Sequence, residues 1–444
     1  MKGDFSRLTF DPHRHFSRVL MQQGRVLLDA DWNEQVYGLL HYLRSAIADL
    51  EGPILPIGEG FKITLRKDPK GNPMDDDFRI EPGHLYVDGI LCENAEAAFY
   101  STQPDYPLDN RDPIEEPHLV YVDVWERHIT HVQDARIREV ALGGTDTTTR
   151  ARVIWQVKLH KLPQGDTCKE VVANWSSLIA EWQAKNRGAL QARTKRPAGF
   201  ATDNPCITSP EARYRGLANR LYRVEIHTGG TVGEATFKWS RENGSVVFPV
   251  RSLSGVIAHV ETLGADEPHS LAPGAWVEIT DDHGELKGEP GQLAEVDFID
   301  PVERSVTLRA PDDVELPEFD EDSKTHPILR RWDYRHGVEG AGSEADDGAV
   351  VVEEGLWLTL EDGIEIRFAP EAGAAHGYRT GDYWLVPART ETGDIEWPND
   401  ADDSPETLGP YGVVHHYAPL AMISSLGSGT EPEDCVESIR RRHG

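Results

Sequence analysis

Hydrophobic and polar residues alternate along five blocks of the chain, and each block is interrupted by turn-forming residues. The blocks span residues 84–93, 236–250, 276–308, 356–368 and 383–397. In the first block, Asp88-Gly89 separates two short alternating runs, which is typical of a two-residue hairpin turn with positive φ at both positions. The third block has three runs and predicts a three-stranded meander, part of a small barrel. The pattern therefore predicts β-hairpins throughout and a mainly β protein.

The first 52 residues differ from the rest because their apolar positions recur at helical spacing. Asp31 is the predicted helix N-cap, with Glu34 completing a capping box, and Gly52-Pro53 ends the helix. The apolar stripe consists of Trp32, Val36, Leu39, Leu40, Leu43, Ile47 and Leu50. We expect this stripe to pack on the chain's own β-core, and the alternative is docking onto a neighbouring protein.

The expected fold class is mainly β, with several small β-sandwich or barrel-like modules, an N-terminal α-helix and one helical insertion. The predicted segments are 1–52, a docking arm and helix; 53–163, a β domain; 164–213, an insertion; 214–310, a barrel-like domain; 311–354, an acidic linker; and 355–444, a C-terminal β module and tail. Within the insertion, residues 171–184 are a predicted helix and residues 185–205 a basic loop. Within the linker, residues 328–335 form a more hydrophobic island.

Composition narrows the classes of partner. The 444 residues include 76 Asp plus Glu against 45 Lys plus Arg, and the net charge of −31 disfavours nucleic acid and anionic membranes. No apolar run approaches the roughly 20 residues that span a bilayer, and the first residues lack the apolar stretch of a secretory signal. We expect synthesis in the bacterial cytoplasm, with any export by another route.

Familiar catalytic and cofactor motifs are missing. The sequence has no G-x-S-x-G, no phosphate-binding P-loop, no H-E-x-x-H and no strand-linked G-x-G-x-x-G. Its four cysteines, at 92, 168, 206 and 435, form no C-x-x-C pair, so they indicate neither a zinc site nor a disulfide framework. We therefore expect no catalytic residues, no metal and no cofactor, although glycoside hydrolysis needs only two carboxylates and leaves no spacing to find.

Several weaker patterns have a structural and a functional interpretation. The pairs His128/His131 and His415/His416 and the clustered aspartates at 75–77, 281–282, 346–347 and 402–403 are expected to be surface or turn residues, with metal binding as the alternative. Tryptophans 239, 276, 357, 384 and 397 are expected in the core, with a sugar-binding face as the alternative. The run Arg330-Arg331-Trp332-Asp333 is expected to be architectural.

Particular segments resemble a known family. They are Met1-Lys-Gly-Asp-Phe-Ser-Arg7, Met21-Gln-Gln-Gly-Arg25, Asp29-Ala-Asp-Trp-Asn-Glu-Gln35, Tyr222-Arg-Val-Glu-Ile-His227, Phe237-Lys-Trp-Ser-Arg-Glu-Asn-Gly-Ser245, Arg331-Trp-Asp333, Leu360-Glu-Asp-Gly363 and Gly381-Asp-Tyr-Trp-Leu-Val-Pro-Ala-Arg389. The family is an uncharacterised bacterial one associated with phage-tail-like contractile injection systems, and the likeness runs from residue 1 to about 423. Some relatives continue into a longer C-terminal region that this chain is expected to lack. The resemblance implies no catalytic residues.

The resemblance implies a non-enzymatic part of a contractile tail-like particle, at the baseplate or as a peripheral tail attachment. Its expected partners are other tail subunits, with further copies of itself in a symmetric assembly as an additional candidate. The expected docking residues are Phe5, Arg7, Phe10, Phe16, Arg18, Gln22, Gln23, Arg25 and Trp32. The rival hypothesis is a carbohydrate-binding or polysaccharide-degrading module, motivated by aromatic and acidic side chains on a β-scaffold. A third hypothesis is an assembly factor that is absent from the finished particle.

Overall fold

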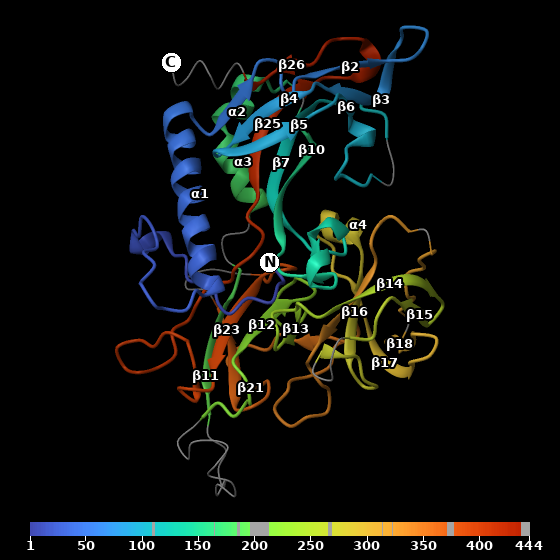
Figure 1. The fold of residues 1–444 in the computed structure, drawn as a ribbon. Helices are drawn as coiled ribbons and strands as arrows, with labels where there is room; N and C mark the ends of the chain where they lie inside the picture. The colour runs from blue at the N-terminus through green and yellow to red at the C-terminus, as the bar shows by residue number, and fades with distance from the viewer. Residues whose placement is uncertain are drawn as a thin grey trace, which may run out of the picture. The chain divides into compact units, whose positions relative to one another are not determined.

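The structure is a computed structural model that describes residues 1–108, 112–163, 165–183, 187–195, 213–264, 269–312, 314–321, 323–370 and 377–436 (Figure 1). The chain forms two compact units, and each is assembled from three separated stretches. Unit 1 comprises Met1–Leu8, Thr130–Thr149 and Asn186–Gly412, and unit 2 comprises Thr9–Ile129, Arg150–Lys185 and Val413–Gly444. The six predicted segments were consecutive, whereas both units join stretches that lie far apart in the chain.

The described residues of unit 2 form three sheets and three α-helices. Its helices are α1 (Asp29–Glu51), α2 (Cys168–Ala173) and α3 (Trp175–Trp182). Its strands are β1 (Ile54–Ile57), β2 (Ile63–Lys67), β3 (Pro73–Ile80), β4 (Gly83–Val87), β5 (Ile90–Asn94), β6 (Ala98–Phe99), β7 (His118–Ile129), β10 (Arg150–Lys161), β25 (His416–Ile423) and β26 (Glu433–Asp434). The sheet orders are β1-β4-β5, β2-β3-β6 and β10-β7-β25-β26.

Long antiparallel pairing holds unit 2 together. Strands β7 and β10 pair over 12 residues, and β25 pairs with the other edge of β7 although it follows some 290 residues later (Figure 1). Alternate positions of β7, including Val120, Val122 and Val124, are fully buried in one hydrophobic cluster with residues of β4, β5 and β25. The predicted β4–β5 hairpin is confirmed, since Asp88 and Gly89 have φ of 47° and 76°.

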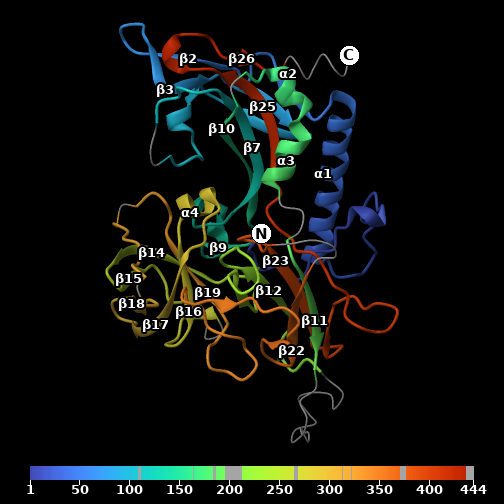
Figure 2. The same cartoon turned by 180° about the vertical axis from the view of Figure 1, so that it is seen from behind.

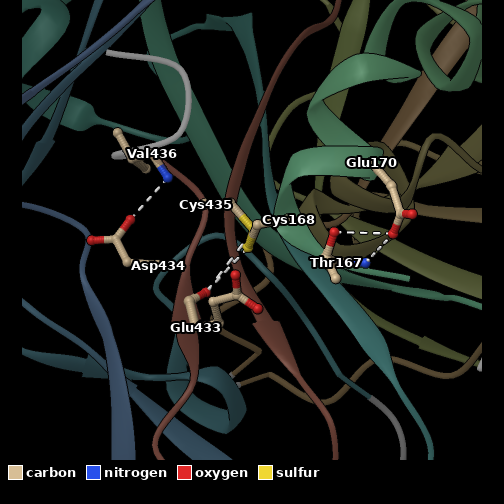
Figure 3. Close-up of a disulfide and its surroundings, with 7 residues drawn as sticks. All are labelled: Thr167, Cys168, Glu170, Glu433, Asp434, Cys435 and Val436. Carbon is tan, nitrogen blue, oxygen red and sulfur yellow. Dashed lines mark hydrogen bonds between the residues drawn. A yellow bond between two sulfur atoms is a disulfide. The ribbon is translucent and has the colours of Figure 1, made fainter. Parts of the chain in front are cut away.

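A disulfide joins the insertion helix to the last described strand region. Cys168, the first residue of α2, is bonded to Cys435, which directly follows β26 (Figure 3). The two cysteines are 267 positions apart in sequence. Both cysteines are fully buried, and α2 is held at its start by a capping box between Thr167 and Glu170. The cysteine spacing indicated no disulfide framework, and this bond was therefore not predicted, because the folding of distant segments decides which cysteines meet.

In unit 1, the described residues form two open sheets, a closed barrel and a small hairpin. Its strands are β8 (Arg138–Glu139), β9 (Thr145–Asp146), β11 (Ala189–Thr194), β12 (Arg220–Ile226), β13 (Thr236–Ser240), β14 (Val247–Ser254), β15 (Ile257–Val260), β16 (Trp276–Thr280), β17 (Gln292–Asp300), β18 (Ser305–Arg309), β19 (Ile328–Trp332), β20 (Val350–Val351), β21 (Leu358–Thr359), β22 (Ile364–Ala369), β23 (Tyr383–Arg389) and β24 (Asp394–Ile395), and its helix is α4 (Asp282–Lys287). The open sheets have the orders β20-β13-β12-β23-β24 and β11-β22-β21.

The barrel has the order β14-β15-β18-β17-β16-β19 and closes by pairing of β19 with both β14 and β16 (Figure 2). It contains the predicted meander of residues 276–308, which is confirmed as β16, β17 and β18. The hydrophobic island at 328–335 provides β19, and its residues Ile328 to Trp332 are all buried. The mainly β class, with barrel-like parts and few helices, is therefore confirmed.

Three local predictions are corrected. Residues 236–250 are not a hairpin, because β13 pairs within the open sheet while β14 belongs to the barrel. Residues 281–284 are not a simple turn: the Asp281 side chain accepts a hydrogen bond from Gly284 N at 2.9 Å and starts α4. The basic loop at 185–205 contains β11, which pairs with β22, and the remainder of that loop from residue 196 lies outside the described residues.

The structure of the insertion and of the two C-terminal hairpins is closer to what the sequence predicts. One helix was predicted near residues 171–184, and two short helices, α2 and α3, meet at Asn174. The hairpins β21–β22 and β23–β24 are confirmed by their pairing. Among the described residues, no helix is both long enough and apolar enough to cross a bilayer.

Candidate docking surface

The first residues of the chain are held inside unit 1. Gly3 is buried, and its carbonyl accepts a hydrogen bond from Asn243 Nδ2 at 2.8 Å. Arg7 forms an ion pair with Glu396 at 3.1 Å, and Phe5 is half-buried. Of the nine predicted docking residues, Phe5 and Arg7 are therefore engaged within their own chain.

The next segment, residues 9–28, is an arm that runs along α1 in unit 2. Phe10 stacks on Tyr37 with ring centroids 5.9 Å apart, and Thr9 Oγ1 donates a hydrogen bond to Glu34. The backbone N–H of Val19 donates to the side-chain oxygen of Gln35 at 3.0 Å. These contacts fall on Glu34, Gln35 and Tyr37, and Phe10 also lies 5.8 Å from the ring of His41.

The rest of the arm exposes apolar and basic side chains together. Phe16, Leu20 and Val26 have exposed fractions of 54%, 70% and 82%. The predicted docking residues Arg18, Gln22, Gln23 and Arg25 are exposed as well. Exposed apolar clusters with a polar rim are typical of interaction sites, so the structure places these residues where a partner can reach them.

Helix α1 also turns its apolar side outward. Trp32, Leu39 and Leu43 have exposed fractions of 61%, 58% and 57%. The two buried positions of the helix are the small residues Ala30 and Gly38, while Leu40 and Ile47 are half-buried. The expectation that the stripe packs on the chain's own core is therefore wrong for most of its residues, because the small side chains occupy the inward face.

The start of α1 differs from the predicted capping box. The helix begins at Asp29 and its N-cap is Leu28, which supplies no side-chain hydrogen bond. Asp29 and Asp31 lie in the first turn, where carboxylates are favoured by the helix dipole. Glu34 is occupied by Thr9, so it cannot act as a cap. The predicted end of the helix at Gly52 is confirmed.

The arm and helix α1 have net charges of opposite sign. Residues 9–28 contain three Arg and one Asp, a net charge of +2, within a chain of net charge −31. Helix α1 contains five acidic residues and one basic residue, a net charge of −4. Its single basic residue, Arg44, makes a bidentate ion pair with Glu126 at 2.9 and 3.1 Å. Helix α1 therefore carries a net negative charge beside its outward apolar face, and its one basic side chain is already paired.

Sequence reasoning missed part of this surface. It selected Trp32 but assigned Val36, Leu39, Leu43 and Leu50 to internal packing. The available signal was the small residues at 30 and 38, which allow close approach on the opposite face. Leu20 and Val26 in the arm were also missed, although an apolar run without a strand or helix pattern suggests a segment that needs a partner.

Three of the four paired histidines have a carboxylate partner inside their own unit. His415 Nδ1 lies 2.7 Å from Asp123, His416 Nδ1 lies 2.8 Å from Asp88, and His131 Nδ1 lies 3.0 Å from Asp146. Among the residues that the structure describes, no group of three or more His, Cys, Asp or Glu side chains is arranged to hold a metal ion. The contacts of His131, His415 and His416 fit a structural role for these three residues.

The indoles proposed as a sugar-binding face lie mostly in the core. Trp239, Trp276 and Trp384 are buried in the main hydrophobic cluster of unit 1. Trp357 is half-buried and stacked by Arg193 and Arg367, with guanidinium carbons 3.8 and 4.7 Å from the ring centre. Trp397 is also half-buried. The arrangement offers no exposed indole platform among these five residues.

Unit 1 buries a network of paired charges between its open sheet and barrel strands. Lys238 Nζ lies 2.5 Å from Glu278 and 3.6 Å from Glu225, and Arg223 Nε donates to Glu225 at 2.5 Å. Burial lowers the pKa of Lys238, and the two glutamates oppose that shift. Burial alone would raise the pKa of Glu225, but Lys2, Arg223 and Lys238 outweigh it and lower the pKa to about 2. Each charge is satisfied internally, so this network is architectural.

A second acidic cluster surrounds Arg241. Its guanidinium donates to Glu361 at 2.7 Å and lies 3.4 Å from Asp333. The Tyr222 hydroxyl donates to the other oxygen of Glu361 at 2.9 Å. Burial raises the pKa of Glu361 to about 7, although Arg241 and Tyr222 act in the opposite direction. A carboxyl group with such a raised pKa could serve as a general acid, but both oxygens of Glu361 already accept hydrogen bonds, one from Arg241 and one from Tyr222.

The run Arg330-Arg331-Trp332-Asp333 is also part of this framework. Arg331 pairs with Glu242 at 3.1 Å and with Asp333 at 3.4 Å. The Trp332 indole N–H donates to Glu278 at 3.0 Å and links the run to the Lys238 network. The expected architectural role of the run agrees with these contacts.

Comparison with known proteins gave one match. The model of a family of unknown function (DUF6519) matches the chain twice, over residues 1–199 and 190–438. Neither a curated protein nor a solved structure matched the chain.

Proposed function

We propose that this chain, which belongs to the family of unknown function DUF6519, is a structural component of a phage-tail-like contractile injection particle, at the baseplate or as a peripheral tail attachment. In this proposal the chain catalyses no reaction and acts by assembly with other tail subunits. The exposed arm at residues 9–28 and the outward apolar face of α1 are its docking surface. The link to a contractile particle comes from the sequence resemblance.

The observation that supports assembly most strongly is the inverted burial of α1. A surface helix normally turns its apolar stripe toward the core, whereas here Trp32, Leu39 and Leu43 are more than half exposed. Burying a leucine side chain contributes about 2 kcal/mol, so several exposed apolar residues in one row favour association with a partner. The β-modules then hold that row at a defined orientation.

The test is incorporation into particles. A variant with Leu39→Asp and Leu43→Asp, and a second with Phe16→Ser, Leu20→Ser and Met21→Ser, replace the wild-type gene in the producing bacterium. Quantitative mass spectrometry of purified particles measures copies per tube subunit. We expect at least about a ten-fold loss in each variant, since about 1.4 kcal/mol of lost association corresponds to ten-fold.

Leu142→Asp is the matched control, because Leu142 is a leucine of unit 1 with an exposed fraction of 63% and lies in neither the arm nor α1. It introduces the same charge and should leave incorporation unchanged. Wild-type stoichiometry in both docking variants would contradict the proposal. Absence of the wild-type chain from finished particles would instead support an assembly factor.

The carbohydrate-active alternative has weaker support, because the indoles that motivated it are buried or stacked by arginine. A glycan array and a hydrolysis assay on bacterial envelope polysaccharide test it directly. Binding or turnover that is lost in a Glu361→Gln variant would favour this alternative over assembly.

A further inference from the structure

The apolar row on α1 has the spacing of a coiled-coil seam. Its residues are Trp32, Val36, Leu39, Leu43, Ala46 and Leu50, which succeed one another at intervals of four, three, four, three and four positions. All six are exposed. This is the alternation of d and a positions over three heptads, with Val36, Leu43 and Leu50 at a and Trp32, Leu39 and Ala46 at d.

The positions beside this seam widen it on one side. The e positions are Asn33, Leu40 and Ile47, so two of the three are apolar, and both are half-buried. An a, d and e face of this kind suits packing in a helical bundle more than a narrow two-stranded contact. At 1.5 Å per residue the 23-residue helix is about 34 Å long, which is enough for a partner helix of three heptads.

The charges of the helix select among partners. A second copy of this chain would bring two helices of net charge −4 together, within two chains of net charge −31 each. Arg44 cannot relieve that repulsion, because it is already paired with Glu126. The chain's own arm contacts Gln35, at a g position, and Tyr37, at a b position, and the six seam residues remain exposed.

We propose that the α1 seam binds a basic amphipathic helix of another protein, with apolar residues at heptad spacing and Lys or Arg along their flanks. This inference rests on the proposed assembly function and specifies its partner. Trp32 at one end supplies a large aromatic anchor of the kind that dominates helix-in-groove interfaces. Asp49, at a g position, attracts the basic flank of the partner.

Site-specific photo-crosslinking in the producing bacterium tests this inference. A benzoylphenylalanine residue replaces Leu39, Leu43 or, as the control, the exposed Leu142 of unit 1, and the particles are purified, irradiated and analysed by peptide mass spectrometry. We expect crosslinks from positions 39 and 43 to exceed those from position 142 by about ten-fold. The crosslinked peptide should have apolar residues at heptad spacing and a net positive charge.

Charge reversal adds a second measurement. Asp49→Lys should lower the crosslink yield from position 43 by about three-fold, whereas Asp49→Asn should lower it less. An unchanged yield with Asp49→Lys would contradict the basic character of the partner.

The outcomes separate this inference from the proposed function. Crosslinks to a second copy, to the same chain or to an acidic or non-helical segment would overturn the inference while leaving assembly intact. The same holds if the chain is incorporated into particles but positions 39 and 43 give no crosslink. Absence of the chain from particles would overturn the proposed function itself.

Discussion

The buried charges of unit 1 and the exposed apolar residues of α1 in unit 2 depart from ordinary burial in opposite directions. Lys238 and Glu278 are almost fully buried and lie 2.5 Å apart, so each satisfies the other inside the protein. Leu39 and Leu43 are more than half exposed, although both are residues that normally lie in a core. The polarity of a side chain therefore does not by itself decide whether it lies in the protein interior or on the surface. A buried charge needs an internal partner, and an exposed apolar row indicates an external one.

The largest effect is expected from breaking the buried network. Lys238→Met should lower the free energy of unfolding by about 3–5 kcal/mol, because Glu278 and Glu225 would be left as buried charges without their lysine. Urea denaturation followed by far-UV circular dichroism measures the change. Lys62→Met is the control, because the Lys62–Glu59 pair is exposed and should contribute nothing measurable. Equal stability of the two variants would contradict the importance of this network.

A matched pair of leucines tests the comparison directly. Leu329, in β19 of the barrel, is fully buried, and Leu329→Ala should lower the free energy of unfolding by about 2–5 kcal/mol. Leu39→Ala should change it by less than about 0.5 kcal/mol, because the side chain has no core contacts to lose. Denaturant titration of the purified chain measures both. If Leu39→Ala lowered the free energy of unfolding as much as Leu329→Ala, this would mean that the outward face of α1 packs internally.

The disulfide of unit 2 should contribute an intermediate amount. Replacing both Cys168 and Cys435 by alanine should lower the free energy of unfolding by about 2–4 kcal/mol, since the bond constrains the unfolded chain over a separation of 267 positions. Dithiothreitol should produce a similar loss in the wild type and no further loss in the double variant. Failure to recover a linked Cys168–Cys435 peptide from non-reduced digests would contradict the pairing.

The smallest effect is the pH dependence that comes from Glu361. The folded pKa of about 7 lies above the ordinary value of 4.5, so the protonated carboxyl is favoured by folding. Its contribution is fully present below about pH 4.5 and is lost as pH rises through about 7, by no more than about 3 kcal/mol. Glu361→Gln should remove this slope between pH 5 and pH 8.

Urea unfolding at the two pH values measures the slope in both proteins. Glu234→Gln is the control, because hydrogen bonds from Thr231 lower the pKa of that exposed carboxyl and place its titration below this window. A slope that persists in Glu361→Gln would mean that other groups cause it, and Asp382 is the next candidate because burial raises its pKa to about 6.

Local turn chemistry made part of the fold predictable. Asp88-Gly89 and Asp362-Gly363 adopt positive φ at both positions and connect paired strands, as their sequence suggests. Asn243-Gly244 has the same turn conformation, yet it connects two different sheets. A turn motif specifies how the backbone reverses, but it cannot specify which strand lies beside the next one, because that depends on pairing with distant residues.

The candidate docking surface shows the same division. Helical spacing made α1 predictable and Gly52-Pro53 marked its end, and the exposed arm residues Arg18, Gln22, Gln23 and Arg25 were selected from sequence. The direction in which the stripe faces was predicted wrongly. The small residues at 30 and 38 were a signal for it, but they do not decide it alone, because either face of such a helix can pack inward. Cys168 and Cys435 likewise gave no spacing signal, since their encounter depends on α2 meeting the end of the chain.

The sequence by itself determined the mainly β class, the acidic surface, the long N-terminal helix and most of the tight turns, because these follow from interactions between residues close in the chain. Tertiary structure alone decided the closure of the barrel, the pairing of the buried charges, the disulfide and the outward orientation of α1. Each of these depends on which distant segments come together, and neither periodicity nor composition records that choice.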